Sequence, residues 1–280
     1  MSKAIAPFRF KKSSRPFKDY YNGWFKTLKN TLLPQLRHAI VGEAMGPVGY
    51  IFAVIHSQFI TNSLVIFPDL SNSNPILLVS RVEVIHRHFL KYYKALDLAT
   101  SNDVSQVLYP DYKNPFEKTF LWLGDLHPYL FINLLRSFIG SESECEIDPK
   151  TLEKQRNWDV VMAWRSPSKR LTTRVDQIEC GLRLMVPALS AREWGRCEGR
   201  KEEMKSAVME SAEADMEELV GVFVDASRLR ESVFSDILSV TDVNQAAVFL
   251  DGLAQFLVGF RNRELLSQFE KCSLEELELN

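Results

Sequence analysis

Apolar residues recur every three or four positions along most of the chain, which is the spacing of amphipathic helices. The first stripe covers residues 17–40, and Pro34 inside it is expected to kink or divide the helix. The second follows Asn74 and Pro75, which suit an N-cap and a first-turn proline, and it reaches Leu96. The inward positions of these two stripes are Tyr20, Tyr21, Trp24, Phe25, Leu28, Leu32, Leu36 and Ile40, then Leu78, Val82, Ile85, Phe89, Tyr92, Tyr93 and Leu96.

The second half of the chain continues the helical spacing. One stripe ends near Pro187, which is expected to perturb the end of its helix. A long charged helix is expected from about residue 200 to 238, and a last one begins where Asp242 and Gln245 have capping-box spacing. The inward positions are Leu171, Val175, Ile178, Leu182 and Met185, then Met204, Val208, Ala212, Met216, Leu219, Phe223, Ala226, Val233 and Ile237, and finally Phe249, Leu250, Leu253, Leu257 and Phe260.

This pattern predicts an all-α fold, a single domain of long amphipathic antiparallel helices. Alternation that could suit a strand is confined to residues 64–67. We assign residues 16–270 to the helical domain, with an exposed acidic linker at about 141–150 inside it. A basic flexible arm, residues 1–15, precedes the domain, and an acidic tail, residues 271–280, follows it.

The stretch FLWLGDLHPYLFINLLRSFIG (residues 120–140) is hydrophobic enough to suggest a membrane span. A spanning helix needs about 20 mostly apolar residues, and this stretch is interrupted by Asp125, His127, Pro128, Asn133 and Arg136. We expect instead two helical pieces joined at Gly124, with Asp125 capping the second and His127 serving helix entry rather than catalysis. The second piece is expected to bury Leu130, Leu134 and Phe138.

Composition places the 280-residue chain among ordinary globular proteins, with 46% apolar residues, 25% charged residues and a net charge of −2. Its four cysteines have no paired spacing, which favours a reduced, cytosol-facing protein. They are Cys145, Cys180, Cys197 and Cys272. Phosphate-binding glycine loops, zinc-protease helices and nucleophile elbows are absent from the sequence, so an enzyme is not expected.

The nearest approach to a metal signature is the pair His86 and His88. Residues two apart on a helix point about 200° apart, so these two cannot face one ion. We expect one of them to be half-buried and the other solvated, and we expect no metal site.

The N-terminal forty residues are strongly basic, with nine Lys or Arg residues and one acidic residue, Asp19. The first part interleaves cations with three phenylalanines. An anionic membrane attracts such a segment by about 1 kcal/mol per Lys or Arg near its surface. Nucleic-acid phosphate could attract it as well, and a simply solvated arm is the third interpretation. For a membrane, the residues expected to bind are Arg9, Lys11, Lys12, Arg15 and Lys18.

Three stretches resemble the plant delay-of-germination domain, which is also part of a class of bZIP transcription factors. They are FKDYYNGWFKTLKNTLLPQL (17–36), the long stretch from HRHFLKYYKALDLA to FINLLRSF (86–138), and VTDVNQAAVFLDGLAQFL (240–257). The middle stretch carries the structural signature Trp122, Gly124, Asp125, Pro128 and Leu134. It departs from the family at GDLHP, where a second Gly or Trp and then Arg-Pro are expected.

Among family members the chain looks most like the inaperturate pollen proteins. The resemblance implies a non-enzymatic plant factor that acts at plasma-membrane domains in pollen aperture formation and shapes the exine. It implies protein partners, such as other aperture factors and a kinase, and it is compatible with a homo-oligomer. The expected location is the cytoplasm and the cytoplasmic face of the plasma membrane.

Two alternatives stay open. The first is a seed-dormancy-type regulator that binds a protein phosphatase and heme, for which His86 is the candidate ligand. The second is a nuclear co-regulator of bZIP factors. Because no bZIP basic region and zipper precede the domain, direct DNA binding is not expected, and otherwise no cofactor is expected.

Overall fold

The computed structural model of the protein describes residues 17–41, 75–108, 110–139, 164, 167–199, 210–263 and 266–267. The all-α expectation is confirmed, since these residues are almost entirely helical. In chain order the elements are α1 (Phe17–Thr27), the π-helical turn η1 (Leu28–Leu32), α2 (Leu33–Val41), α4 (Pro75–Asn102), α5 (Ser105–Leu108), α6 (Pro115–Lys118), β1 (Leu121–Trp122), β2 (Asp125–Leu126), α7 (Tyr129–Ile139), α10 (Lys169–Gly199), α11 (Glu210–Val240) and α12 (Val243–Gly259).

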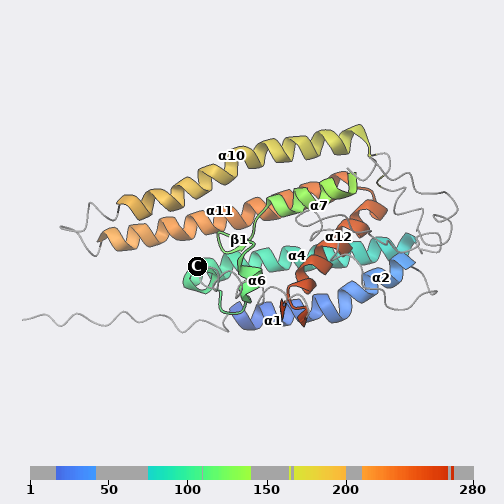
Figure 1. Ribbon diagram of the computed structural model, residues 1–280, viewed down its shortest axis with the longest axis horizontal. Coiled ribbons are helices and arrows are strands. Elements are labelled where there is room, and N and C mark those ends of the chain that lie inside the picture. Colours follow the sequence, from blue (N-terminus) through green and yellow to red (C-terminus); the bar gives the residue numbers. More distant parts are fainter. Residues whose placement is uncertain are drawn as a thin grey trace, which may run out of the picture.

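The long helices lie side by side in the order α10, α11, α4 and α1–α2, as Figure 1 shows from top to bottom. Neighbours run antiparallel. Arg174 of α10 pairs with Asp236 of α11, whereas Arg192, further along α10, pairs with the earlier Asp225. Helix α12 lies across α4, α2 and α7 and is buried along nearly its whole length. One hydrophobic core therefore joins all the long helices.

Helix termini follow the chemistry expected of the sequence. Asp242 accepts hydrogen bonds from the N–H groups of Asn244 and Gln245, and the side chain of Gln245 accepts one from the N–H of Asp242, which confirms the capping box of α12.

The first stripe is divided, as expected, by the π-helical turn η1 just before Pro34. Proline has no N–H to donate, and the N–H of Leu33 closes the wide turn onto the carbonyl of Leu28.

Most inward positions are confirmed as buried, with three clear exceptions: Tyr20, Met185 and Met216 are 37%, 47% and 53% exposed. On α10 the buried stripe moves on to Val186, which turns Met185 outward. Met216 lies in the first turns of α11. The contact with the C-terminal part of α4 comes later in α11, where Arg228 lies 3.8 Å from Asp97, and Figure 1 shows the beginning of α11 extending past the end of α4. The expectation that Pro187 disturbs a helix end is wrong, because α10 continues to Gly199.

Several expectations fall outside the described residues. These are the basic arm at residues 1–15, the strand-like residues 64–67, the acidic linker at 141–150, the acidic tail at 271–280, and the inward positions Met204 and Val208. None of the described helices has both the length and the hydrophobicity that crossing a bilayer requires.

Candidate functional site

The family-signature segment forms a β-hairpin rather than the junction of two helical pieces. Strands β1 and β2 pair antiparallel, with Trp122 opposite Asp125. The two turn residues, Leu123 and Gly124, have φ of 45° and 86°, the left-handed pair that a two-residue hairpin turn requires. A Cβ on Gly124 would lie 3.0 Å from the ring of Phe223. Glycine is needed here for both its φ and its size.

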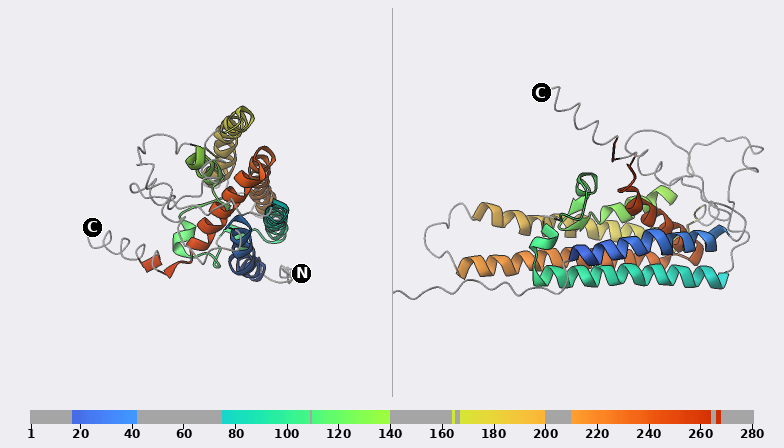
Figure 2. Two further views of the ribbon diagram at one scale, coloured as in Figure 1. Left: turned by 90° about the vertical axis from the view of Figure 1, so that its right-hand side faces the viewer. Right: turned by 90° about the horizontal axis from the view of Figure 1, so that it is seen from below.

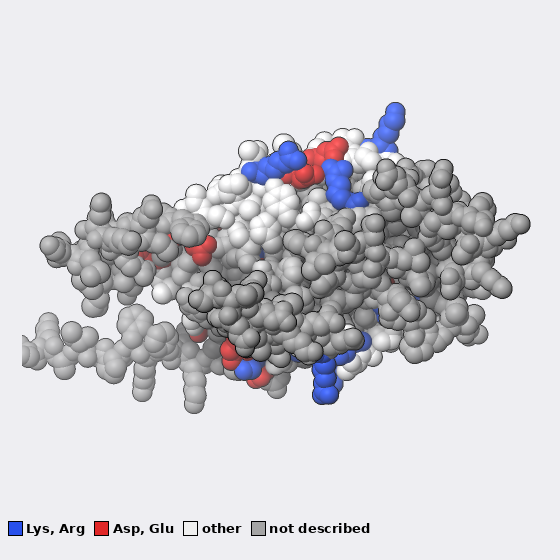
Figure 3. Space-filling model, in the orientation of Figure 1, with Lys and Arg blue, Asp and Glu red and all other residues white. Residues whose placement is uncertain are grey.

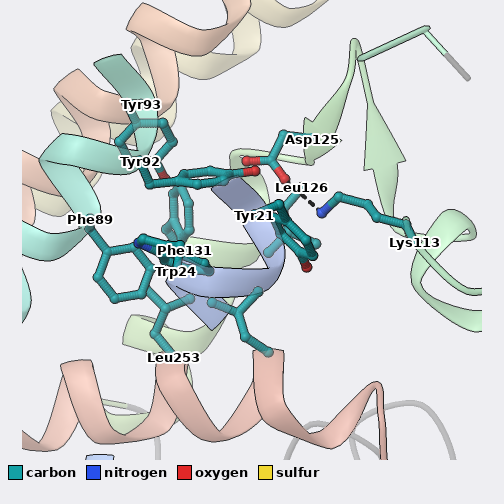
Figure 4. Close-up of a pocket in the computed structure, with 11 residues that line it drawn as sticks. Tyr21, Trp24, Phe89, Tyr92, Tyr93, Lys113, Asp125, Leu126, Phe131 and Leu253 are labelled. Atoms are coloured by element: carbon teal, nitrogen blue, oxygen red, sulfur yellow. Dashed lines mark hydrogen bonds and ion pairs between the residues drawn. The ribbon is translucent and has the colours of Figure 1, made fainter. Parts of the chain in front are cut away.

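Asp125 does not cap a helix, which corrects the sequence-based expectation. Its side chain points into the core, where it accepts a hydrogen bond from Lys113 Nζ at 3.1 Å (Figure 4). Lys113 Nζ also lies 3.9 Å from Glu117, and Glu117 accepts a hydrogen bond from the Tyr21 hydroxyl at 2.7 Å. All three charged side chains are almost fully buried, at 1%, 1% and 6% exposure for Lys113, Glu117 and Asp125. We call these three and Tyr21 the buried ionic centre.

Burial opposes the charge of Lys113, but Asp125 and Glu117 outweigh it, so the pKa of Lys113 lies above its usual value. Burial, and then Glu117, raise the pKa of the Tyr21 hydroxyl far above its usual value. The ionic centre is therefore a fixed arrangement at physiological pH, with Lys113 charged and Tyr21 a neutral donor. The two ion pairs of Lys113 and the hydrogen bond from Tyr21 to Glu117 hold the hairpin, α6 and α1 together.

A second buried cation, Arg230 of α11, holds the hairpin from its other side. Its guanidinium donates to the carbonyls of Leu126 at 2.6 Å and Leu123 at 3.1 Å, and also to that of Trp122. It also lies 5.3 Å from the centre of the Trp122 ring, a cation–π contact. Two-residue strands leave most of their carbonyls without a ladder partner, so Arg230 satisfies groups that burial would otherwise penalise.

The residues after the hairpin begin α7. His127 Nδ1 accepts a hydrogen bond from the N–H of Tyr129 at 3.2 Å, so this histidine has the helix-entry role expected of it. Burial, and then Arg230, lower its pKa. Pro128 is buried just before the helix, and Leu134 is 5% exposed against α12, where it lies 3.4 Å from the Cβ position of Gly252. The five signature residues thus build one structural unit.

A small cavity lies against the buried ionic centre, with a volume of about 10 Å³. Five of its eleven lining residues are aromatic residues of α1 and α4, which Figure 4 shows around the cavity. A space of this size is at the limit of what one water molecule needs. Among the described residues, no group of three His, Cys, Asp or Glu is placed to hold a metal ion. The chemistry of this centre is that of packing and pairing.

The two histidines of α4 face different neighbours, as expected, but neither is solvated, which corrects the expectation for one of them. His88 stacks on Trp24 with ring centres 5.1 Å apart, and its Nε2 lies 3.1 Å from the Trp24 carbonyl. His86 packs against Phe234, and its buried Nε2 has no hydrogen-bond partner among the described residues. Burial lowers the pKa of both rings.

Of the five cations expected at a membrane, only Lys18 is described. Its ammonium forms an exposed ion pair with Asp111 at 2.8 Å. Arg9, Lys11, Lys12 and Arg15 lie outside the described residues.

Sequence reasoning missed Lys113, Glu117 and Arg230. Signals for two of them were present. Asn114 and Glu117 have capping-box spacing, and the structure forms that box at the start of α6. Arg230 occupies an inward position between Ala226 and Val233, where a charged residue must find partners.

Comparison with known proteins identifies the family of the chain. The family model DOG1, seed dormancy control, matches residues 69–137, which include α4 and the hairpin. The chain is 38% identical to Protein INAPERTURATE POLLEN1 of Arabidopsis thaliana, over 96% of this chain and 99% of that protein. The chain belongs to the DOG1 family, among the inaperturate pollen proteins. It is also 30% identical to the Protein INAPERTURATE POLLEN 1 homolog of Oryza sativa subsp. japonica, over 92% of this chain and 90% of the relative.

Proposed function

We propose that the protein is a non-enzymatic factor in pollen aperture formation. The observation that carries this proposal is the full-length likeness to two proteins named for inaperturate pollen, from a dicot and a grass. A likeness over nearly the whole of both chains favours a shared role more strongly than a shared domain would. Both names refer to inaperturate pollen, which is pollen without apertures.

The buried ionic centre supports a structural rather than a catalytic role for the signature residues. Lys113 and Asp125 form an ion pair with each other, and the adjacent cavity is too small for an organic substrate. A general acid or base must reach a substrate proton, and these groups are almost completely buried. A protein built in this way acts by presenting its surface to partners.

We further propose that this surface works at the cytoplasmic face of the plasma membrane. The cations Arg9, Lys11, Lys12 and Arg15 suit an anionic leaflet, and Lys18 adds to them when its exposed pair with Asp111 opens. A single basic segment gives weak, reversible binding. Contacts with protein partners, which we expect to include other aperture factors and a kinase, would add avidity at such sites.

The location of a fluorescently tagged copy in developing male meiocytes and tetrads tests this function. Discrete patches at the plasma membrane, which coincide with the sites of future apertures, are the expected result. A diffuse nuclear signal would contradict it and favour a co-regulator of bZIP factors. A copy without residues 1–15 tests the membrane contact separately from the aperture role, because it should no longer be recruited to the membrane while remaining folded.

Heme binding in a seed-dormancy role is the second candidate, favoured by the family match and by the unpartnered Nε2 of His86. The fit is poor in this conformation, because the ring of Phe234 packs against His86 with ring centres 5.6 Å apart. Binding would require α4 and α11 to separate locally. A hemin titration tests it: a Soret shift lost in His86→Ala but kept in His88→Ala is the result that the candidate requires.

A further inference from the structure

The outer face of α4 carries a stripe of exposed residues that the core does not explain. Arg87, Lys91, Lys94 and Leu98 follow one another at spacings of four, three and four, so they line one side of the helix. Leu98 is 64% exposed, and the neighbouring Tyr20 of α1 is 37% exposed. The Tyr20 hydroxyl donates to the carbonyl of Lys91 at 3.0 Å, which fixes the ring beside the stripe. We call these five residues the α4 stripe.

The charge of the α4 stripe is mostly unbalanced. Arg87 forms an ion pair with Glu83, but neither Lys91 nor Lys94 forms an ion pair with a described residue. The top of the molecule differs, because basic and acidic side chains lie side by side where α10 runs (Figure 3). There Arg136 pairs with both Asp176 and Glu179 of α10.

The α4 stripe is also close to the point where the basic arm joins the domain. Phe17 begins α1, and its N–H donates to the side chain of Gln106 just beyond the end of α4. Helices α1, α2 and α4 lie side by side along this face, as the right-hand view of Figure 2 shows. Cations of the arm and of the stripe can therefore meet one flat surface together.

We propose that the α4 stripe is a second membrane-binding surface, which meets the same anionic leaflet as the basic arm. Two unpaired lysines supply attraction to anionic headgroups. Tyr20 supplies an aromatic ring with a polar tip, and Leu98 an exposed apolar side chain, which is the composition of an interfacial contact. This inference rests on the proposed function, since it assigns a further contact to the same membrane.

Binding of the full chain to vesicles measures the contribution of the stripe. The probe is phosphatidylcholine vesicles with and without phosphatidylserine, and the readout is co-sedimentation across a lipid titration. Lys91→Gln with Lys94→Gln should weaken binding to the anionic vesicles about 25-fold, at about fivefold per lysine. Tyr20→Ser with Leu98→Ser should weaken it further without changing its dependence on salt.

A matched control removes the same charge elsewhere. Lys169 and Arg170 are exposed at the start of α10 and pair with no described acidic residue. Lys169→Gln with Arg170→Gln should leave binding unchanged, and circular dichroism should show every variant folded. Equal weakening by the control pair would overturn the proposal, because only net charge would then matter.

The variant without residues 1–15 separates this inference from the arm. If this variant no longer binds the vesicles while Lys91→Gln with Lys94→Gln binds like the intact chain, membrane binding by the stripe is refuted and membrane binding by the arm is supported. The reverse result refutes the arm and keeps the stripe. If the intact chain ignores anionic vesicles and binds a DNA duplex instead, both membrane contacts are wrong.

Discussion

Removing the cation of the buried ionic centre should be among the most damaging single changes in this protein. Lys113→Met keeps the length of the side chain but leaves Asp125 and Glu117 buried without their cation. Breaking a buried pair from one side costs about 3–5 kcal/mol, because an uncompensated charge stays in the core. For a domain of this size, each kcal/mol lowers Tm by about 2–4 °C, so Tm should fall by roughly 6–20 °C.

Chemical denaturation, monitored by circular dichroism, gives the free energy of unfolding. A double-mutant cycle then shows whether the pair itself is responsible. Lys113→Met combined with Asp125→Asn should cost less than the two single changes added together, by about 0.5–3 kcal/mol. The exposed pair Lys18–Asp111 is the control, and Lys18→Met should change Tm little. A loss under about 1 kcal/mol for Lys113→Met, or strict additivity in the cycle, would refute this account of the centre.

Three further changes test other parts of the fold. Gly124→Ala should lower Tm, because its φ is 86° and Phe223 leaves no room, whereas Gly23→Ala, in open space within α1, should raise it slightly. Leu134→Asp should abolish folding, seen as lost helical circular dichroism, while Leu184→Asp, at a site 71% exposed, should be tolerated. The free energy of unfolding should fall as the pH drops below about 6.5, because the unfolded chain binds protons there before the folded one does. Denaturant titrations at several pH values measure how the free energy of unfolding changes with pH, and no change would contradict the prediction. The groups responsible are His86, His88 and His127, whose pKa is lowered by burial.

The helices and their buried faces could be predicted from the sequence because period and burial are local properties. Asp242 and Gln245 even locate the start of α12 to the residue. One error occurred where a helix leaves its neighbours. Met216 has the right spacing for the core, but it lies in the first turns of α11, before the part where Arg228 meets Asp97 of α4. Sequence spacing gives the side of a helix and cannot say how far along it the packing continues.

The hairpin escaped prediction for a different reason. Its strands are two residues long, so they have no alternation to detect. Leu123 has a positive φ, which the presence of a leucine does not predict. The apolar residues around it continue the helical composition of their neighbours. Gly124 marked the turn correctly, but the choice between a helix junction and a hairpin depends on contacts with Phe223 and Arg230, which lie about a hundred residues away.

Long-range pairing also explains why the signature holds a charged residue within an apolar stretch. Asp125 faces Lys113 on one side of the hairpin, while Arg230 takes up the hairpin carbonyls on the other. Sliding the hairpin along α11 would separate both sets of partners at once. Apolar contacts alone would tolerate such a slip, since they have no direction. The buried charges therefore fix the position of the hairpin, and with it the start of α7, relative to α6 and α11.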